Sequence, residues 1–322
     1  MIKVAIVGYG NLGRGVEIAI SNVSDVELVG VFSRRNPESV KTLGAKVFPY
    51  NDLLSGKLDI DVCILCGGSA TDLPHQTPEL AAYYNVVDTY DNHALIPEHF
   101  DKVDNVSKLN NTTSIISSGW DPGLFSIQRL MSEAILPNGQ TNTFWGKGVS
   151  QGHSDALRRL EGVLDAVQYT IPNEVVIDRL RNHEVLELET RDKHVRECFV
   201  VLEDESDENS VRESIVTMPN YFEPYETTVH FISMDELKKN HSTMPHGGIV
   251  LRQGTSSDVS HVMEYKLSLE SNPEFTASVA LAYARAAYRL HSEGTFGAMS
   301  VFDIAPKYLS PKSDAQLRKE LL

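Results

Sequence analysis

Short apolar runs alternate with helical patterns over the first third of the chain. The runs cover residues 2–7, 26–32, 61–66, 85–88 and 114–117. Their lack of polar alternation is typical of strands buried on both faces. Between them, apolar periodicity predicts helices over residues 11–20, near 78–84 and over 100–109. Strands that alternate with helices predict an α/β fold with a Rossmann-like, doubly wound parallel sheet.

The middle of the chain has a different pattern. Strand patterns follow one another with fewer helices, at residues 141–146, 197–202, 226–232 and 261–269. A helix is predicted over residues 155–169, and the acidic run 203–209 is predicted to be a solvated loop. This arrangement predicts an α+β domain with a mostly antiparallel sheet. Near the end, residues 275–292 form an amphipathic helical pattern that Gly294 stops.

Length and charge narrow the functional classes. A chain of 322 residues is long enough for two domains of about 150 residues each. Its 29 cationic and 44 acidic residues give a net charge of −15, which argues against nucleic acid or an anionic membrane as partner. No apolar run reaches the roughly 18 residues of a membrane span, and no signal peptide is visible. We therefore expect a soluble cytoplasmic protein.

The three cysteines do not suggest a disulfide framework or a metal site. Cys63 and Cys66 have a CxxC spacing, but strand positions three apart point to opposite faces. No second cysteine pair accompanies them to complete a zinc site. We expect both to be buried strand residues and expect no bound metal.

A glycine motif follows the first predicted strand and opens the first predicted helix. Residues 8–13 read GYGNLG, the GxGxxG pattern of dinucleotide-binding turns in the context that supports it. The first glycine permits a tight turn, the second lets the backbone approach a pyrophosphate, and the third lets helix and strand pack closely. The helix start then offers N–H groups to phosphate oxygens. The alternative is a glycine turn without a ligand.

The end of the second predicted strand favours NADP over NAD. NAD sites usually carry an acidic residue there, to bind the ribose 2′-hydroxyl group. This chain instead has Ser33, Arg34 and Arg35, which suit a 2′-phosphate because guanidinium groups bind phosphate with a fork of donors. Two solvated surface arginines are the alternative.

Three more strand ends are predicted to border the same crevice. The Gly67-Gly68-Ser69 turn follows the strand at 61–66 and is expected to contact the cofactor. Asp91 and Asp121 follow the strands at 85–88 and 114–117, and two carboxylates there could attract an ammonium group or accept protons. The alternative role is turn formation, which the Asp121-Pro122-Gly123 sequence also explains.

Segments spread over nearly the whole chain carry a family resemblance. The chain resembles the meso-diaminopimelate dehydrogenase family. The matching segments are VAIVGYGNLGR (4–14), FSRR (32–35), GSATD (68–72), VDTYDNH (87–93), SGWDPG (118–123), TFWG (143–146), SQGHSDALRR (150–159), AVQYT (166–170), ECFV (197–200), TMPHGG (243–248) and NPEFTAS (272–278).

The resemblance implies an activity, a cofactor and a domain organisation. The activity is reversible, NADP-dependent oxidative deamination at the D-centre of meso-2,6-diaminopimelate, in lysine biosynthesis. The products are L-2-amino-6-oxopimelate, ammonia and NADPH. We expect residues 1–120 with about 275–322 to form the dinucleotide-binding domain. Residues 121–274 are expected to form the substrate-binding and dimerisation domain of a homodimer.

The resemblance also assigns residues to the substrate and the cofactor. Asp91 and Asp121 would hold the reacting D-amino acid end, with Trp145, Gln151 and Gly152 around it. The distal L-amino acid end would be bound by Thr170, Arg196, His246 and Asn272, where Arg196 would clamp a carboxylate. The expected cofactor contacts are Gly8, Tyr9, Gly10, Asn11, Leu12, Gly13, Ser33, Arg34, Arg35, Cys66, Gly67, Gly68, Ser69, Thr89, Tyr90, Asp91, Ser118, Gly119, Trp120, Asp121 and Pro122.

The chemistry requires a base, because hydride leaves only from a carbon that bears a neutral amine. Our hypothesis is that Asp121 transfers the proton while Asp91 positions the amine, with His153 as the competing base. Two other functions stay open: another NADP-dependent imine or semialdehyde reductase, and an NADP-sensing regulator without catalysis. A semialdehyde dehydrogenase needs a nucleophilic cysteine, for which Cys198 in a predicted strand is a poor candidate. A regulator would lack the clustered polar groups that the resemblance assigns to the substrate.

Overall fold

The computed structural model describes residues 1–219 and 221–322, with the side chain of Gln151 also outside the description. The chain divides into two compact units. The first comprises residues 1–127 and 273–322, and the second comprises residues 128–272. Each unit has its own sheets and its own apolar core.

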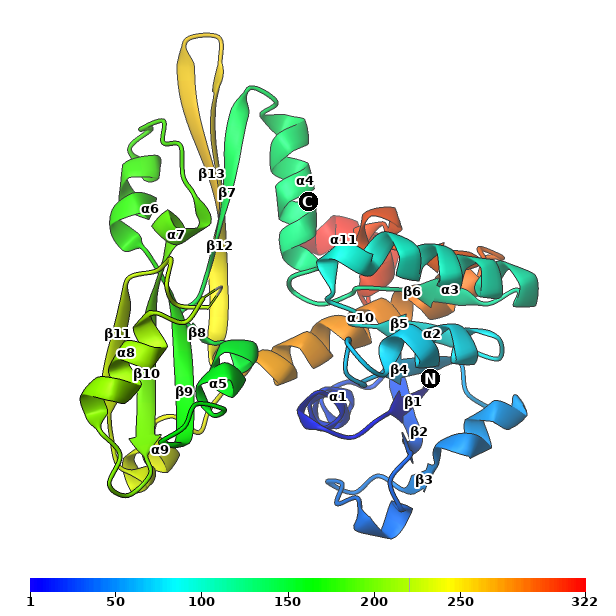
Figure 1. Ribbon diagram of the computed structural model, residues 1–322. Helices are drawn as coiled ribbons and strands as arrows, with labels where there is room; N and C mark the ends of the chain where they lie inside the picture. The colour runs from blue at the N-terminus through cyan, green and yellow to red at the C-terminus, as the bar shows by residue number, and fades with distance from the viewer. Residues whose placement is uncertain (220) are drawn as a thin grey trace. The chain divides into compact units, whose positions relative to one another are not determined.

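The first unit is built on a seven-stranded sheet (Figure 1). Its order is β14-β6-β5-β4-β1-β2-β3, and every strand pair in it is parallel. The strands are β1 (Ile2–Val7), β2 (Val26–Ser33), β3 (Val47–Pro49), β4 (Val62–Leu65), β5 (Asn85–Asp88), β6 (Thr113–Ile115) and β14 (Gly297–Met299). The chain leaves β1 toward β2 and β3 on one side and later adds β4, β5 and β6 on the other. The carboxyl ends of β1 and β4 therefore form the switch point where such sheets bind ligands.

Helices cover both faces of this sheet. One apolar cluster joins Val4 and Ile6 to Val16 of α1 and to Ala280 of α10, while a second joins Val7 on the other face to α2 and α3. The helices are α1 (Asn11–Ser21), α2 (Leu73–Ala81), α3 (Ile96–Asn110), α4 (Leu124–Ile135), α10 (Asn272–Ser292) and α11 (Asp314–Leu321). The predicted doubly wound sheet is therefore confirmed.

The second unit contains two smaller sheets. One has the order β11-β10-β9-β8 and the other β13-β12-β7, and only the β10–β11 pair is parallel. The strands are β7 (Gly139–Trp145), β8 (Gly148–Val149), β9 (Val163–Pro172), β10 (His194–Leu202), β11 (Thr227–Phe231), β12 (His246–Ser256) and β13 (Val259–Leu269). The helices are α5 (Gln151–Leu157), α6 (Glu174–Arg181), α7 (Thr190–Lys193), α8 (Glu208–Val216) and α9 (Met234–Asn240). The mostly antiparallel sheet is confirmed.

The helix predicted over residues 155–169 is wrong. α5 ends at Leu157, Gly162 adopts a positive φ of 84°, and β9 begins at Val163. β9 pairs with β8 on one side and β10 on the other, so tertiary pairing overrides the local helical periodicity. The pattern also missed β12, which begins at His246 and contains Gly247 and Gly248.

The division between the units falls a few residues from the boundaries that we expected. The turn after β6 belongs to the first unit, and it is attached to β5 there, because the Ser118 N–H donates to the Asp88 carbonyl at 2.9 Å. The boundary therefore falls inside α4, after Ile127, and the return falls at Pro273. Within the described residues, no helix is long and apolar enough to cross a membrane, and no group of three or more metal-ligating side chains comes together.

Candidate active site

The glycine turn has the geometry that a phosphate-binding turn requires. Gly8 has a φ of +88°, which side chains rarely permit. A Cβ on Gly13 would lie 2.3 Å from the Gly8 carbonyl oxygen, so helix and turn pack together only with glycine there. A Cβ on Gly10 would instead meet nothing within 4 Å. The space in front of Gly10 is therefore open to a ligand at the start of α1, where helix N–H groups favour phosphate.

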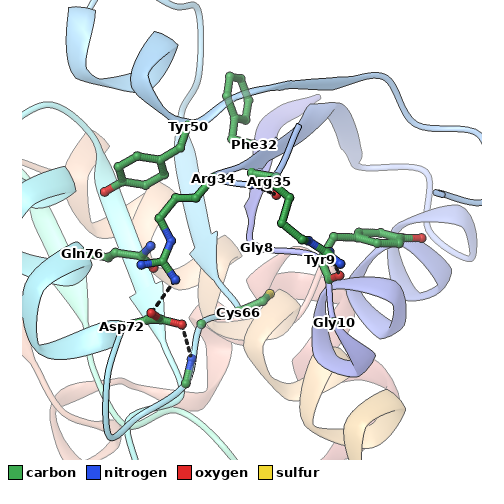
Figure 2. Close-up of a pocket in the computed structure, with 13 residues that line it drawn as sticks. Gly8, Tyr9, Gly10, Phe32, Arg34, Arg35, Tyr50, Cys66, Asp72 and Gln76 are labelled. Atoms are coloured by element: carbon green, nitrogen blue, oxygen red, sulfur yellow. Dashed lines mark hydrogen bonds and ion pairs between the residues drawn. The ribbon is translucent and has the colours of Figure 1, made fainter. Parts of the chain in front are cut away.

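A pocket of about 600 Å³ opens at this turn, within the first unit. It extends from the ends of β1 and β4 to the end of β2, as the switch-point rule expects. Figure 2 shows the side chains that line it. The lining residues are Gly8, Tyr9, Gly10, Phe32, Ser33, Arg34, Arg35, Tyr50, Cys66, Gly67, Gly68, Asp72 and Gln76.

The two cysteines of the CxxC spacing have different surroundings. Cys63 is fully buried within β4, as expected. The expectation of a buried strand position is wrong for Cys66, which follows the last residue of β4 and is only half-buried, because the chain turns there into the glycine segment. Cys66 lines the pocket, as its assignment to the cofactor site implied.

Arg34 and Arg35 lie at the end of β2, and their guanidinium groups bind different partners. Arg34 extends across the pocket to Asp72, with Nη2 2.5 Å from Oδ1 (Figure 2). Arg35 donates from its guanidinium group to the carbonyl oxygen of Tyr9 in the glycine turn. Ser33 is buried, and its hydroxyl oxygen accepts the Arg35 N–H at 3.1 Å. Both cations therefore border the pocket, where they suit a 2′-phosphate.

Sequence reasoning missed four lining residues: Phe32, Tyr50, Asp72 and Gln76. Asp72 accepts the Gly68 N–H at 3.0 Å as well as the Arg34 bond. Burial alone would raise the pKa of Asp72, but these two partners outweigh burial and lower it. Gln76 is buried, and its Oε1 has no partner among the described residues. Asp72 lies inside the GSATD segment (68–72) that carries the family resemblance, and this segment could have pointed to it.

The remaining cofactor assignments lie outside this pocket's lining. Ser69 follows the second glycine turn, and its hydroxyl oxygen accepts the N–H of Asp91 at 3.2 Å. The other such residues belong to the α1 start or to the loops after β5 and β6. They are Asn11, Leu12, Gly13, Thr89, Tyr90, Asp91, Ser118, Gly119, Trp120, Asp121 and Pro122.

Asp91 and Asp121 both belong to the first unit, on those two loops. Asp91 is exposed and Asp121 is half-buried. Parallel strands end at the same edge of a sheet, and β5 pairs directly with β6. The fold therefore delivers both carboxylates to one edge of the sheet, which is also the edge of the pocket.

In the second unit, Arg196 is a buried cation with a spare donor. Its guanidinium donates from Nη1 to the Thr170 hydroxyl, which lies directly opposite on β9, and its Cζ lies 4.0 Å from the centre of the Tyr225 ring. Arg196 is buried, which lowers its pKa, yet Nε has no partner among the described residues. Arginine stays charged even so. A buried guanidinium with an unused donor fits a carboxylate ligand.

Trp145 and His246 lie in closely packed surroundings near the end of β7. The main-chain N–H of Trp145 donates to Nε2 of the buried His194 at 2.7 Å, and the rings of the two residues stack. A Cβ on Gly148 would lie 2.5 Å from the His246 ring, so that ring packs where only glycine fits. Asn272 starts α10, and its N–H donates to the Met244 carbonyl at 2.9 Å. His194 was missed by sequence reasoning, although it stands two residues before Arg196 on the same strand face.

His153 lies on α5 beside the exposed Gly152. Its Nδ1 lies 2.7 Å from the Ser150 hydroxyl, and its ring packs edge-on against Tyr221 and Phe222. Burial, together with the positive charge of Arg196, lowers the pKa of His153 to about 4. The assignment of Gln151 falls on a side chain outside the described residues.

Comparison with known proteins decides the family. The diaminopimelic acid dehydrogenase C-terminal domain matches residues 119–271. A meso-diaminopimelate D-dehydrogenase from Ureibacillus thermosphaericus is 58% identical over 324 residues, which cover 100% of this chain and 99% of the relative. The chain belongs to the meso-diaminopimelate D-dehydrogenase family. The predicted family is therefore confirmed.

Solved structures of this family agree with the fold. The diaminopimelate dehydrogenase of Corynebacterium glutamicum, in complex with DAP, is 45% identical with a TM-score of 0.89, covering 100% of this chain and 99% of that chain. An engineered D-amino acid dehydrogenase bound to NADP+ is 43% identical with a TM-score of 0.85, at the same coverage. The family's fold therefore extends over both units of this chain.

Proposed function

We propose that this chain catalyses the reversible, NADP-dependent oxidative deamination of meso-2,6-diaminopimelate at its D-configured carbon. The carbon–hydrogen and carbon–nitrogen bonds at that centre break, water supplies the carbonyl oxygen, and L-2-amino-6-oxopimelate, ammonia, NADPH and a proton result. The 2-amino-6-oxopimelate cyclises to tetrahydrodipicolinate, an intermediate of lysine biosynthesis. The observation that supports the proposal most strongly is the arginine-bordered glycine pocket in a chain of this family.

The pocket residues fit the cofactor. Gly10 leaves open space at the helix start for a pyrophosphate, while Arg34 and Arg35 supply cationic donors at the β2 end for a 2′-phosphate. When bound, NADP+ supplies the hydride acceptor.

Asp91 and Asp121 are proposed to hold the D-amino acid end of the substrate. Two carboxylates attract the ammonium group, and a nearby base must take its proton before hydride can leave. We assign proton transfer to Asp121 and amine positioning to Asp91. The family resemblance adds Trp145, Gln151 and Gly152 around this end. His153 remains the competing base.

The distal L-amino acid end is assigned to Arg196, Thr170, His246 and Asn272. Arg196 supports this assignment most directly, because its buried Nε lacks a partner among the described residues and a substrate carboxylate would supply one. Thr170 orients the guanidinium from the opposite strand, and Tyr225 supports its face. A substrate with a carboxylate at each end would therefore be preferred over a D-amino acid with one.

We also propose that the chain acts as a homodimer in the cytoplasm, as the family resemblance implies. A chain of 35.7 kDa would then elute at twice that mass in size-exclusion chromatography with light scattering. A monomer mass at micromolar concentration would contradict the dimer.

A substrate and cofactor matrix tests the function. Protein is mixed with NADP+ or NAD+ and with the meso, L,L or D,D isomer of diaminopimelate, and absorbance of the reduced nicotinamide is followed. We expect rapid reduction of NADP+ with the meso isomer and little with the L,L isomer or with NAD+. Equal rates with all combinations, or no reduction with the meso isomer, would contradict the proposal.

A further inference from the structure

Asp88 is a fully buried acidic residue that the proposed reaction does not use. It is the last residue of β5, and its exposed fraction is 0%. A buried carboxylate is costly unless several hydrogen bonds satisfy its oxygens. Its contacts are therefore informative about why it is there.

One carboxylate oxygen of Asp88 binds two loops at once. Its Oδ1 accepts the N–H of Tyr90 at 3.1 Å and the N–H of Ser117 at 2.8 Å. Tyr90 directly precedes Asp91, and Ser117 opens the loop that carries Asp121. The main-chain carbonyl of Asp88 strengthens the second attachment by accepting both the N–H and the hydroxyl of Ser118, at 2.9 and 2.8 Å.

The other carboxylate oxygen is fixed by the helices on that face of the sheet. Oδ2 accepts the Thr77 hydroxyl of α2 at 2.8 Å and lies 2.7 Å from Nε2 of the buried His99 on α3. The His99 ring in turn stacks on Tyr90, with ring centres 4.2 Å apart. Oδ2 therefore contacts the helices α2 and α3, while Oδ1 binds the loops after β5 and β6.

The backbone at Ser117 indicates what this attachment does. Ser117 has a φ of +55°, a left-handed conformation that non-glycine residues keep only where the surroundings impose it. The Asp88 carboxylate accepts the N–H of that residue. An apolar side chain in place of Asp88 would leave this N–H and that of Tyr90 without their acceptor, which is costly in a buried position.

We propose that Asp88 is a positioning residue whose carboxylate sets the separation of Asp91 and Asp121 by fastening both of their loops to the end of β5. The inference rests on the proposed function, in which those two carboxylates hold the reacting amino group. Asp88 itself does not contact substrate in this proposal. Its loss should weaken the reaction at the D-centre while leaving the arginine-bordered cofactor pocket intact.

Three variants test this assignment. Asp88→Ala removes the carboxylate bonds to Tyr90 and Ser117 but keeps the main-chain bonds to Ser118. Asp88→Asn keeps an oxygen that can accept the two N–H groups with a weaker, uncharged bond. Thr77→Val is the matched control, because it removes one bond to the same carboxylate without touching either loop. Hydrogen exchange of peptides that span residues 85–95 and 113–124 measures loop attachment without reference to activity.

In Asp88→Ala we expect amide exchange in both loops to accelerate at least about tenfold and kcat/KM for meso-diaminopimelate to fall about 20-fold or more. Asp88→Asn should retain most of the turnover and exchange about fivefold faster at the loops. Thr77→Val should lower the melting temperature but not change either loop's exchange.

Wild-type exchange in a folded Asp88→Ala variant, or an equal loss of kcat/KM in Thr77→Val, would overturn the proposal. If Asp88→Ala does not fold, Asp88→Asn decides, and unchanged exchange at both loops overturns it. Failure of the proposed function would show separately, as a wild-type protein that does not reduce NADP+ with meso-diaminopimelate.

Discussion

Two side chains at the end of β2, Arg34 and Arg35, are proposed to determine which dinucleotide the pocket favours. Arg34 pairs with Asp72 across the pocket, and Arg35 binds the Tyr9 carbonyl. An arginine that is already held near its working position loses less side-chain entropy when phosphate binds. The cofactor prediction from the sequence depended on the residue types alone. The structure adds Asp72 as the group that holds one of them.

Replacing Arg34 tests this cofactor assignment. In Arg34→Ala, the loss of a charge-assisted contact should raise the KM for NADP+ about 10- to 100-fold and leave the KM for NAD+ within about threefold. Initial-rate kinetics with both cofactors measure the change, and Arg318→Ala on α11 is the charge-matched control. Parallel losses with both cofactors would show that Arg34 does not read the 2′-phosphate.

Asp121 and His153 are distinguished by pH dependence. We expect Asp121→Asn to lower kcat about 100-fold or more and to remove the limb of the kcat/KM profile that the base produces. The pKa of His153 is lowered to about 4, so His153→Asn should leave every limb above pH 6 in place. Near-normal turnover and an unchanged profile in Asp121→Asn would eliminate Asp121 as the base.

At the scale of elements, two glycines in the turn between β1 and α1 have different surroundings, so one affects stability and the other is proposed to affect cofactor binding. Gly13 is required by packing, because its Cβ would meet the Gly8 carbonyl oxygen, whereas Gly10 faces open space. The sequence motif predicts close helix–strand packing at Gly13 and ligand approach at Gly10. The structure adds that a Cβ would clash with backbone at Gly13 and would meet nothing within 4 Å at Gly10.

Two matched alanine substitutions test this division. Gly10→Ala should leave the melting temperature nearly unchanged and weaken NADP+ binding about tenfold or more, because its methyl group occupies ligand space. Gly13→Ala should destabilise the fold by about 2 kcal/mol or more, because backbone must move to avoid the clash. Thermal melts and cofactor titrations measure both. Equal melting temperatures for the two variants would contradict the argument.

Secondary structure was predictable where local pattern and tertiary environment agree. β1 and β5 match the predicted runs, because strands buried on both faces lack the polar alternation of a half-exposed strand. β9 was mistaken for a helix, and its pairing with β8 and β10 is information that no local window contains. The same reason hid β12, which gains its partners from β7 and β13.

For the molecule as a whole, buried histidines make stability depend on pH. Burial, reinforced by the charge of Arg196, lowers the pKa values of His153 and His194 from 6.5 to about 4. Both are neutral in the folded chain near neutrality, while the unfolded chain takes up their protons below pH 6.5. Their contribution to stability is therefore full above pH 6.5 and is lost as the pH falls toward 4.

This linkage predicts the slope of stability against pH. Each of the two histidines should contribute about 1 kcal/mol per pH unit to the fall in unfolding free energy between pH 6 and 4.5. His194→Gln keeps an acceptor for the Trp145 N–H and should reduce that slope by one histidine's share, while the exposed His75→Gln serves as control. Urea denaturation across this range measures the slope. An unchanged slope in His194→Gln would refute the assignment.

From the sequence alone we predicted the parallel sheet, the glycine turn and the cofactor class, because each depends on short runs of residues whose types have local physical consequences. The family was predicted from its resemblance to segments along nearly the whole chain. Tertiary structure alone decided which side chains meet: Asp72 with Arg34, His194 with Trp145, and Asp88 with the loops of Asp91 and Asp121. These partners lie on different strands and helices. A chain's local pattern encodes the period of an element but not its neighbours, so contacts across elements appear only when the sheet is assembled.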